Sequence, residues 1–142
     1  MKRGSILLTL SIPVFVLGFW LGRVTTGDAE MKNRVFELRV YTANEGKLEA
    51  LLARFREHTT RLFEKHGMTN IGYWTAVDTP RSQNTLIYLL AHPSREGADK
   101  AWAAFRDDPE WKKVKEESEV NGVLAGKVES TFLTATDFSN LK

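Results

Sequence analysis

The segment Arg34–Tyr41 alternates apolar and polar residues, which is the pattern of a half-buried β-strand. Three apolar side chains, Phe36, Leu38 and Val40, lie on one face of this predicted strand. We interpret this face as the stripe that packs on the hydrophobic core. The rest of the fold must be built around a strand whose two faces differ this much in chemistry.

The second face of the strand carries a carboxylate, a guanidinium and a phenol at two-residue spacing, from Glu37, Arg39 and Tyr41. Such a face either meets water or lines a polar cavity. As ligand-binding residues, the three would line the interior of a barrel, and Arg39 would hold a carboxylate or an enolate. The alternative is a structural Glu37–Arg39 pair at a dimer interface, with Tyr41 at its rim.

A long amphipathic helix is predicted next, ending near His66 and Gly67. Its apolar stripe recurs at three- and four-residue steps: Leu48, Leu51, Leu52, Phe55, Thr59, Leu62 and Phe63. Residues 70–77 and 85–91 then read as two strands of a hairpin. The loop 78–84 between them contains Pro80, which cannot continue a paired strand. The second strand of the hairpin is apolar on both faces, which predicts a central position in the sheet.

The second helical region is predicted to begin at Ser94, a favourable N-cap residue. Ala98, Ala101, Trp102 and Phe105 fall on one face of this helix. Asp108 and Pro109 then break it and begin another helix, with Asp108 as the cap and Pro109 at the first helical position. A last strand is expected from Lys127 to Thr134.

This order of elements predicts an α+β, ferredoxin-like βαββαβ fold, in which helices cover one face of a four-stranded antiparallel sheet. The other face of the sheet is left bare. We expect large rings there, from Tyr73 or Trp74, Tyr88 and Phe132. An exposed apolar face of this size normally has a partner, and two such faces packed together in a twofold dimer would bury it. We therefore predict a homodimer, a dimeric α/β-barrel.

The first thirty residues differ from the rest of the chain. Lys2 and Arg3 precede an uncharged run, Ile6–Leu21, and small and polar residues follow to Glu30. Residues 1–30 are thus predicted to be a cleaved signal peptide or an uncleaved membrane anchor, which the sequence leaves open. Either would place a domain at 34–138, with a short tail at 139–142, on the outer side of the cytoplasmic membrane. Membrane contact is expected only through this N-terminal segment.

Composition excludes several classes of function. Basic and acidic residues nearly balance once Lys2, Arg3 and Arg23 are set aside, which argues against nucleic acid as a partner. The chain has no cysteine, so disulfides and thiol catalysis are excluded. Its histidines lack the local spacing of metal ligands, and it has no phosphate-binding or dinucleotide-binding glycine motif. We predict neither a metal nor a cofactor.

Further candidate ligand-binding residues are aromatic or lie at the ends of elements. Tyr73, Trp74 and Tyr88 would floor an apolar pocket, whereas we assign Trp102 and Phe105 to core packing. His66 either caps the end of the long helix or reaches a ligand. His92, before Pro93, either reaches the mouth of a pocket or is a turn residue, and we interpret it as a turn residue.

Much of the chain resembles the NIPSNAP domain. The resemblance runs from Arg34 to Phe138 and is carried by seven stretches: Val35–Thr42, Gly46–Leu48, Phe63–Met68, Ile71–Trp74, Leu86–His92, Ser94–Glu96 and Trp102–Trp111. It implies a dimeric α/β-barrel, and it implies no mechanism. More distant families with this barrel include cofactor-free monooxygenases and haem-handling proteins, a likeness of fold alone.

Three functions follow as expectations. The first is an exported or membrane-tethered protein that binds a small, largely apolar ligand in a homodimeric barrel. The second is a cofactor-independent monooxygenase or isomerase in which Arg39 or a histidine stabilises an enolate. The third is a non-catalytic dimeric interaction module. A binder or an enzyme requires a cavity reached by Glu37, Arg39 and Tyr41, whereas an interaction module would have that face packed solid.

Overall fold

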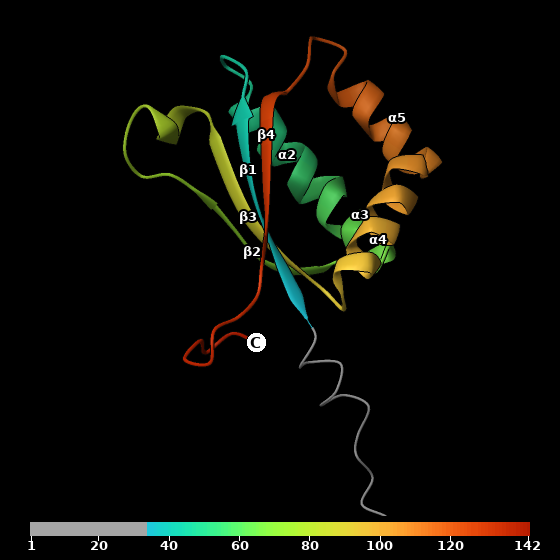
Figure 1. Ribbon diagram of the computed structural model, residues 1–142. Helices are drawn as coiled ribbons and strands as arrows, with labels where there is room; N and C mark the ends of the chain where they lie inside the picture. Colours follow the sequence, from blue (N-terminus) through green and yellow to red (C-terminus); the bar gives the residue numbers. More distant parts are fainter. Residues whose placement is uncertain (1–33) are drawn as a thin grey trace, which may run out of the picture.

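A computed structural model of the protein describes residues 34–142. Their elements, in chain order, are β1 (Val35–Ala43), α2 (Leu48–Arg54), the π-helical segment η1 (Phe55–Thr59), α3 (Thr60–Lys65), β2 (Thr69–Thr75), the short 3-10 turn η2 (Arg81–Gln83), β3 (Thr85–His92), α4 (Arg95–Asp107), α5 (Pro109–Ser118) and β4 (Ala125–Leu133) (Figure 1). The signal peptide or anchor predicted at residues 1–30 lies outside the described residues. Between residues 34 and 142, no helix has the length and apolar character needed to cross a membrane.

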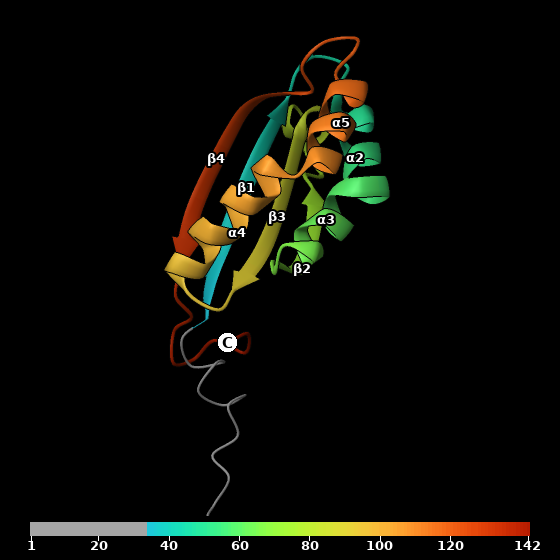
Figure 2. The same ribbon diagram turned by 90° about the vertical axis from the view of Figure 1, so that its right-hand side faces the viewer.

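The strands form one antiparallel sheet in the order β2-β3-β1-β4, with β2 and β4 at the edges. All the α-helices lie on the same face of this sheet, and Figure 2 looks onto that helical layer. This is the ferredoxin-like arrangement that the order of elements predicts. The central strands are β3 and β1, as expected for the strongly apolar β3.

The long helix is continuous but contains one wide turn. Its middle, η1, is π-helical, and the Thr59 hydroxyl donates to the Arg54 carbonyl oxygen at 3.2 Å, which satisfies a carbonyl in the widened turn. The helix ends as predicted at Gly67, whose φ of 79° suits a residue without a side chain. The Met68 N–H then donates to the Phe63 carbonyl at 3.0 Å and closes the end.

The starts of the second helical region also confirm the sequence prediction. The Ser94 hydroxyl accepts from the Gly97 N–H at 2.9 Å and caps α4. Asp108 interrupts the helical path, and its Oδ1 accepts from the Glu110 N–H at 2.7 Å, which caps α5 with Pro109 in the first turn.

The core between sheet and helices is rich in aromatic rings. Phe63 from α3 lies 5.3 Å from the Trp102 ring and 5.0 Å from the Phe105 ring, centroid to centroid, and both partners belong to α4. Phe55 and Tyr88 are 5.2 Å apart. Edge-on and tilted pairs at these separations add roughly 0.5–1.5 kcal/mol each to the burial of their area. The assignment of Trp102 and Phe105 to the core is confirmed.

The two faces of β1 are reversed relative to our expectation. Glu37, Arg39 and Tyr41 point toward the helices, because they share a face with Leu90, Tyr88 and Leu86 of β3, which are buried in the core. The apolar side chains Leu38 and Val40 lie on the opposite face, which no helix covers and which we call the open face. Alternation separates two faces of a strand but carries no information on which one the helices cover.

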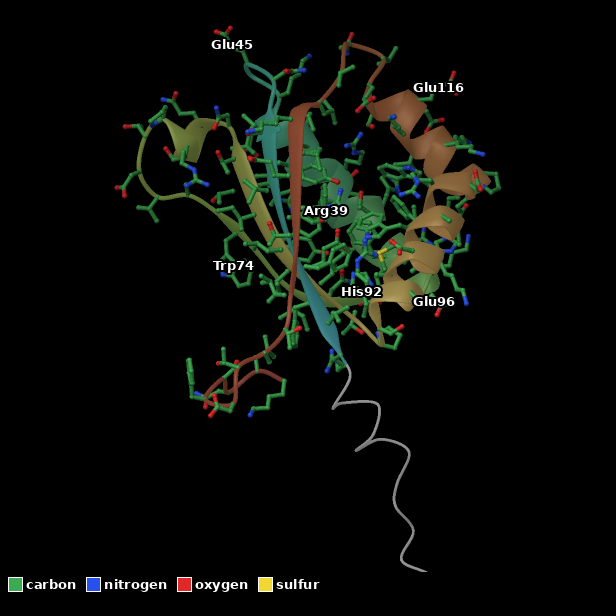
Figure 3. All side chains as sticks on the ribbon, in the orientation of Figure 1. Arg39, Glu45, Trp74, His92, Glu96 and Glu116 are labelled. Atoms are coloured by element: carbon green, nitrogen blue, oxygen red, sulfur yellow. The ribbon has the colours of Figure 1, made fainter. Side chains whose placement is uncertain are left out.

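Most of the aromatic rings that we expected on the bare face of the sheet also lie on the helix side. Tyr73, Tyr88 and Phe132 are in register with β1 residues of the helix side, so the prediction that they lie on the bare face is wrong. Trp74 does lie on the open face, where it is 53% exposed, and Figure 3 shows it on the side of the sheet away from Arg39 and His92. Strand β2 ends at Thr75, two residues earlier than predicted.

Candidate functional site

A buried carboxylate organises the polar residues beneath the helices. Glu37 is 1% exposed. Its Oε1 accepts from Arg39 Nη1 and from the Ser130 hydroxyl, both at 2.7 Å, and its Oε2 accepts from Trp102 Nε1 at 2.6 Å and from His92 Nε2 at 2.9 Å. We call these five residues the Glu37 network. Figure 3 shows Arg39 and His92 of this network on the helix side of the sheet.

The network joins four separate elements. Glu37 and Arg39 come from β1, His92 from the end of β3, Ser130 from β4 and Trp102 from α4. The β-pairing brings the strand residues together, because Arg39 is opposite Ser130 on one side and opposite Tyr88 on the other. Trp102 reaches the carboxylate because α4 crosses above the central strands.

The network keeps Glu37 ionised. Burial raises the pKa of a carboxyl group, but the hydrogen bonds from His92, Ser130, Trp102 and Arg39 outweigh it and lower the pKa of Glu37 to about 2. An ionised carboxylate only accepts hydrogen bonds, so His92 Nε2 must carry the proton. A carboxylate so fully hydrogen-bonded is a poor base, and its role is to orient Arg39 and His92.

The Arg39 side chain contacts both the Glu37 carboxylate and aromatic rings. Its guanidinium lies 4.2 Å from the Trp102 ring centroid, and its Nη2 makes a long 3.4 Å contact with the Tyr41 hydroxyl. Burial lowers the pKa of Arg39, but the neighbouring Tyr88, Tyr41 and Glu37 raise it, and the net result is a pKa above the ordinary value. Arg39 is therefore a permanent cation that holds a single orientation.

Arg39 and its neighbour Tyr88 each have a buried donor without a hydrogen-bond partner among residues 34–142. The donors are Arg39 Nε and the Tyr88 hydroxyl, and the two residues lie directly opposite each other on β1 and β3. Burial and the neighbouring Tyr41 raise the pKa of Tyr88 well above its ordinary value, so the phenol keeps its proton. Buried polar groups are nearly always hydrogen-bonded, so two unpaired donors on neighbouring strands make this region a candidate site for an oxygen acceptor.

The helix layer leaves β4 uncovered. Val128 and Ser130 have their side chains on the helix side of the sheet, opposite Tyr41 and Arg39, yet both residues are exposed. Phe132, opposite Glu37, is half-buried beneath the Arg95 guanidinium of α4. We call the surface of Val128, Ser130 and Phe132 the β4 margin. It leads from solvent to Arg39, whose side chain is 15% exposed.

The predicted candidates divide into two groups. Glu37, Arg39, Tyr41 and Tyr88 come together as described, and the Tyr73 ring stacks on Tyr88 at 5.3 Å. Trp74 is separated from them by the sheet.

His66 also lies apart, where its Nε2 donates to Asp108 at 2.6 Å. Hydrogen bonds from Lys65 and His66 lower the pKa of Asp108 below its ordinary value. His66 therefore ties the end of α3 to the cap of α5, which is the structural one of its two predicted roles.

Sequence reasoning missed three members of the network. His92 is a buried partner of Glu37 and not a turn residue, Trp102 donates to Glu37 in addition to packing, and Ser130 was not singled out. One signal was present for His92: it directly follows a run of residues that is apolar on both faces of the strand, and a residue in that position should be buried. The Trp102 and Ser130 contacts depend on the packing of α4 and on the register of β4.

Surface hollows in the described part of the chain include one on the open face beside the C-terminal segment and one between α2 and α5. Neither is lined by Glu37, Arg39 or Tyr41. Among residues 34–142 no three acidic or histidine side chains gather as metal ligands.

The family model of NIPSNAP matches residues 36–140. The chain belongs to the NIPSNAP family. A search of curated proteins finds no match. Among solved structures, a NIPSNAP family protein from Agrobacterium tumefaciens is 24% identical, with a TM-score of 0.67 over 78% of this chain and 100% of the other. A NIPSNAP-like domain protein from Burkholderia xenovorans is 18% identical, with a TM-score of 0.66 over 76% and 90%.

A more distant likeness concerns an enzyme. SnoaB, a cofactor-independent oxygenase from Streptomyces nogalater, is 11% identical, with a TM-score of 0.52 over 76% of this chain and 98% of SnoaB. Identities this low establish a shared fold and leave the chemistry of this NIPSNAP protein to its own residues.

Proposed function

We propose that this NIPSNAP protein binds a small, largely apolar molecule at the β4 margin and holds an oxygen atom of that molecule with Arg39. The observation that carries the proposal is a pair of donors without a partner among residues 34–142, Arg39 Nε and the Tyr88 hydroxyl, on the two central strands beside the exposed strand β4. A carbonyl or carboxylate oxygen is the complement of two such donors.

The β4 margin supplies the apolar part of this proposed site. Val128 is 45% exposed although it lies on the helix side of the sheet, and the rings of Tyr41 and Phe132 flank Arg39 and Glu37. A ligand lying along these residues would cover them while its oxygen replaced water at Arg39. The charge of Arg39 is already balanced by Glu37, so the site suits a neutral or singly charged molecule.

Binding is better supported than catalysis by the positions of the unpaired groups. His92 Nδ1 is buried and has no hydrogen-bond partner among residues 34–142; it would be the natural base, since Glu37 orients the ring through Nε2. His92 and Tyr88 are four residues apart on β3, which is about 13 Å along a strand. A base at His92 and an oxyanion at Tyr88 would therefore act on different parts of a small molecule.

Native mass spectrometry of the full chain, purified gently from its host, tests the proposal. We expect a small-molecule adduct on the wild-type protein and on Lys127→Ala, which removes a cation from the other face of β4. We expect its loss from Arg39→Ala and its weakening in Ser130→Ala, which leaves Arg39 in place. Adduct-free protein throughout would contradict the proposal and favour the interaction module. If every adduct of the wild type is also found on Arg39→Ala, the proposal is contradicted as well.

We also propose that the protein is a homodimer whose sheets pack through their open faces. Leu38, Val40 and Ile87 form an apolar surface there, with Trp74 beside it. Because the charged residues of β1 point the other way, this face is more apolar than the sequence pattern suggested. Exposed apolar surfaces of this kind generally mark an interface.

Sedimentation of the wild-type protein and of Leu38→Lys measures this association. The wild type should be dimeric at micromolar concentration, and the lysine should raise the dissociation constant at least about 100-fold, because each copy would bury a charge in the proposed interface. Val128→Lys, on the helix side, should leave the dimer intact. A wild-type protein that is monomeric under these conditions would exclude the dimer.

The proposed location is the outer side of the cytoplasmic membrane, either free after export or held by residues 1–30. The basic start and the uncharged run Ile6–Leu21 support this location. Sequencing the N-terminus of the protein recovered from membrane and soluble fractions decides between cleavage and anchoring. Recovery of the intact chain from the cytoplasm alone would contradict both.

A further inference from the structure

A second candidate site lies on the open face, away from the Glu37 network. The chain after β4 turns back beneath the sheet, on the side opposite the helices (Figure 1). It borders an open hollow of about 300 Å³ against the ends of the strands. Six of the residues that line it are Phe36, Leu89, Leu133, Ala135, Thr136 and Leu141. This volume is at the lower end of the range for small-molecule sites, roughly 300–1,000 Å³.

The wall of the hollow contributed by the C-terminal segment has its own structure. The Ser139 N–H donates to the Thr136 carbonyl at 3.1 Å, and the Ser139 hydroxyl donates to the Leu141 carbonyl at 2.7 Å. These bonds form a turn that turns polar groups toward each other and presents Ala135 and Leu141 to the sheet. Among residues 34–142, no charged side chain lines the hollow, so it suits a hydrocarbon chain.

The positively charged side chain of Arg34 lies beside this apolar hollow. The Arg34 guanidinium lies over the Phe36 ring, 5.7 Å from its centroid. It forms no ion pair with a carboxylate among residues 34–142. A partner that fits both features carries a hydrocarbon chain and an anionic head.

We infer that this hollow binds a single-chain fatty-acid carboxylate, with its hydrocarbon between Phe36, Leu133 and Leu141 and its head at Arg34. The site is independent of the one proposed at Arg39, which lies on the other face of the sheet. Arg34 is also where the chain enters the sheet, so residues 1–30, as a membrane anchor, would hold the hollow close to a bilayer, where fatty acids partition.

Photo-labelling of the full-length protein in phosphatidylcholine nanodiscs tests this site, with a diazirine-bearing fatty acid as the probe. Trypsin releases residues 128–142 as a single peptide, which contains Leu133, Ala135 and Leu141. We expect the label on this peptide, and we expect laurate to compete for it about tenfold better than lauryl alcohol, which has the same chain but no charge.

Three variants sharpen the result. Arg34→Ala should abolish the preference for laurate over the alcohol, whereas Arg106→Ala, which removes an exposed guanidinium from α4, should preserve it. Ala135→Trp should fill the hollow from a position outside the strands and reduce labelling of the peptide at least about tenfold, with the sheet intact by circular dichroism.

Three outcomes would overturn the inference. The first is a label on other peptides only. The second is labelling that disappears as the protein concentration rises and dimer forms, which would make the hollow part of the interface between copies. The third is Arg34-dependent binding to phosphatidylglycerol vesicles without competition by laurate, which would indicate contact with a membrane surface.

Discussion

The two faces of the sheet handle polar groups in opposite ways. Beneath the helices, Glu37 is buried and Arg39 is partly buried among aromatic rings, and the carboxylate accepts from four different side chains. On the open face, Leu38, Val40 and Trp74 present apolar surface that no helix covers. The usual expectation, apolar toward the helices and charged toward solvent, does not hold for β1.

This difference indicates that the covered face is suited to binding a ligand and that the open face is suited to association with another apolar surface. A buried ion pair stabilises a fold only when its other hydrogen-bonding positions are satisfied, and Glu37 meets this requirement whereas Arg39 does not. The unpaired Nε of Arg39 is the reason to expect a ligand on the covered face. The open face has apolar area to bury and no such requirement.

The largest expected effect comes from removing the charge of Glu37. Glu37→Gln leaves Arg39 as an uncompensated buried cation and should lower the free energy of unfolding by about 3 kcal/mol. Glu129→Gln makes the same change on exposed β4 and should cost less than about 0.5 kcal/mol. Urea unfolding of both variants measures the difference, and equal losses would show that the two carboxylates are in equivalent surroundings.

The free energy of unfolding should also depend on pH because of Glu37. The pKa of Glu37 falls from its ordinary value of 4.5 to about 2 in the folded protein, so its contribution is complete above pH 4.5 and is lost as the pH falls toward 2. This shift corresponds to at most about 3 kcal/mol. Because hydrogen bonds also lower the pKa of Asp108, which adds its own dependence on acid, the measurement is the difference between wild type and Glu37→Gln, which should shrink with falling pH. A constant difference would contradict the assignment.

A smaller effect compares one substitution on the two faces. Trp102→Phe removes a hydrogen bond to a charged, buried carboxylate and should lower the free energy of unfolding by about 2 kcal/mol. Trp74→Phe, on the open face, should change the monomer by less than about 0.5 kcal/mol. Thermal or urea unfolding in dilute solution tests the pair. A larger loss for Trp74→Phe would mean that the open face is already packed under those conditions.

The sequence was a good guide wherever a signal is local. The caps at Ser94 and Asp108, the helix end at Gly67 and the central place of β3 all follow from a few neighbouring residues, and each is confirmed. The widened turn at η1 was not foreseen, because it depends on how Phe55 and Thr59 pack against the rest of the core.

The site was predicted only in part for the same reason. Glu37, Arg39 and Tyr41 stand out because polar groups at alternate positions are visible within one strand. Their partners His92, Trp102 and Ser130 lie 55, 65 and 93 residues from Glu37 along the chain. Contacts of that range are made by strand register and helix packing, which leave no mark on a single stretch of sequence.

The sequence by itself therefore determined the order of the elements, the ferredoxin-like plan and membership of the NIPSNAP family, because these rest on periodicity, capping residues and shared motifs. Only the tertiary structure decided that the helices cover the charged face of β1. A strand pattern has a period of two and is unchanged when its faces are exchanged, so the choice was made by the aromatic core, where four donors surround Glu37 and make its burial possible.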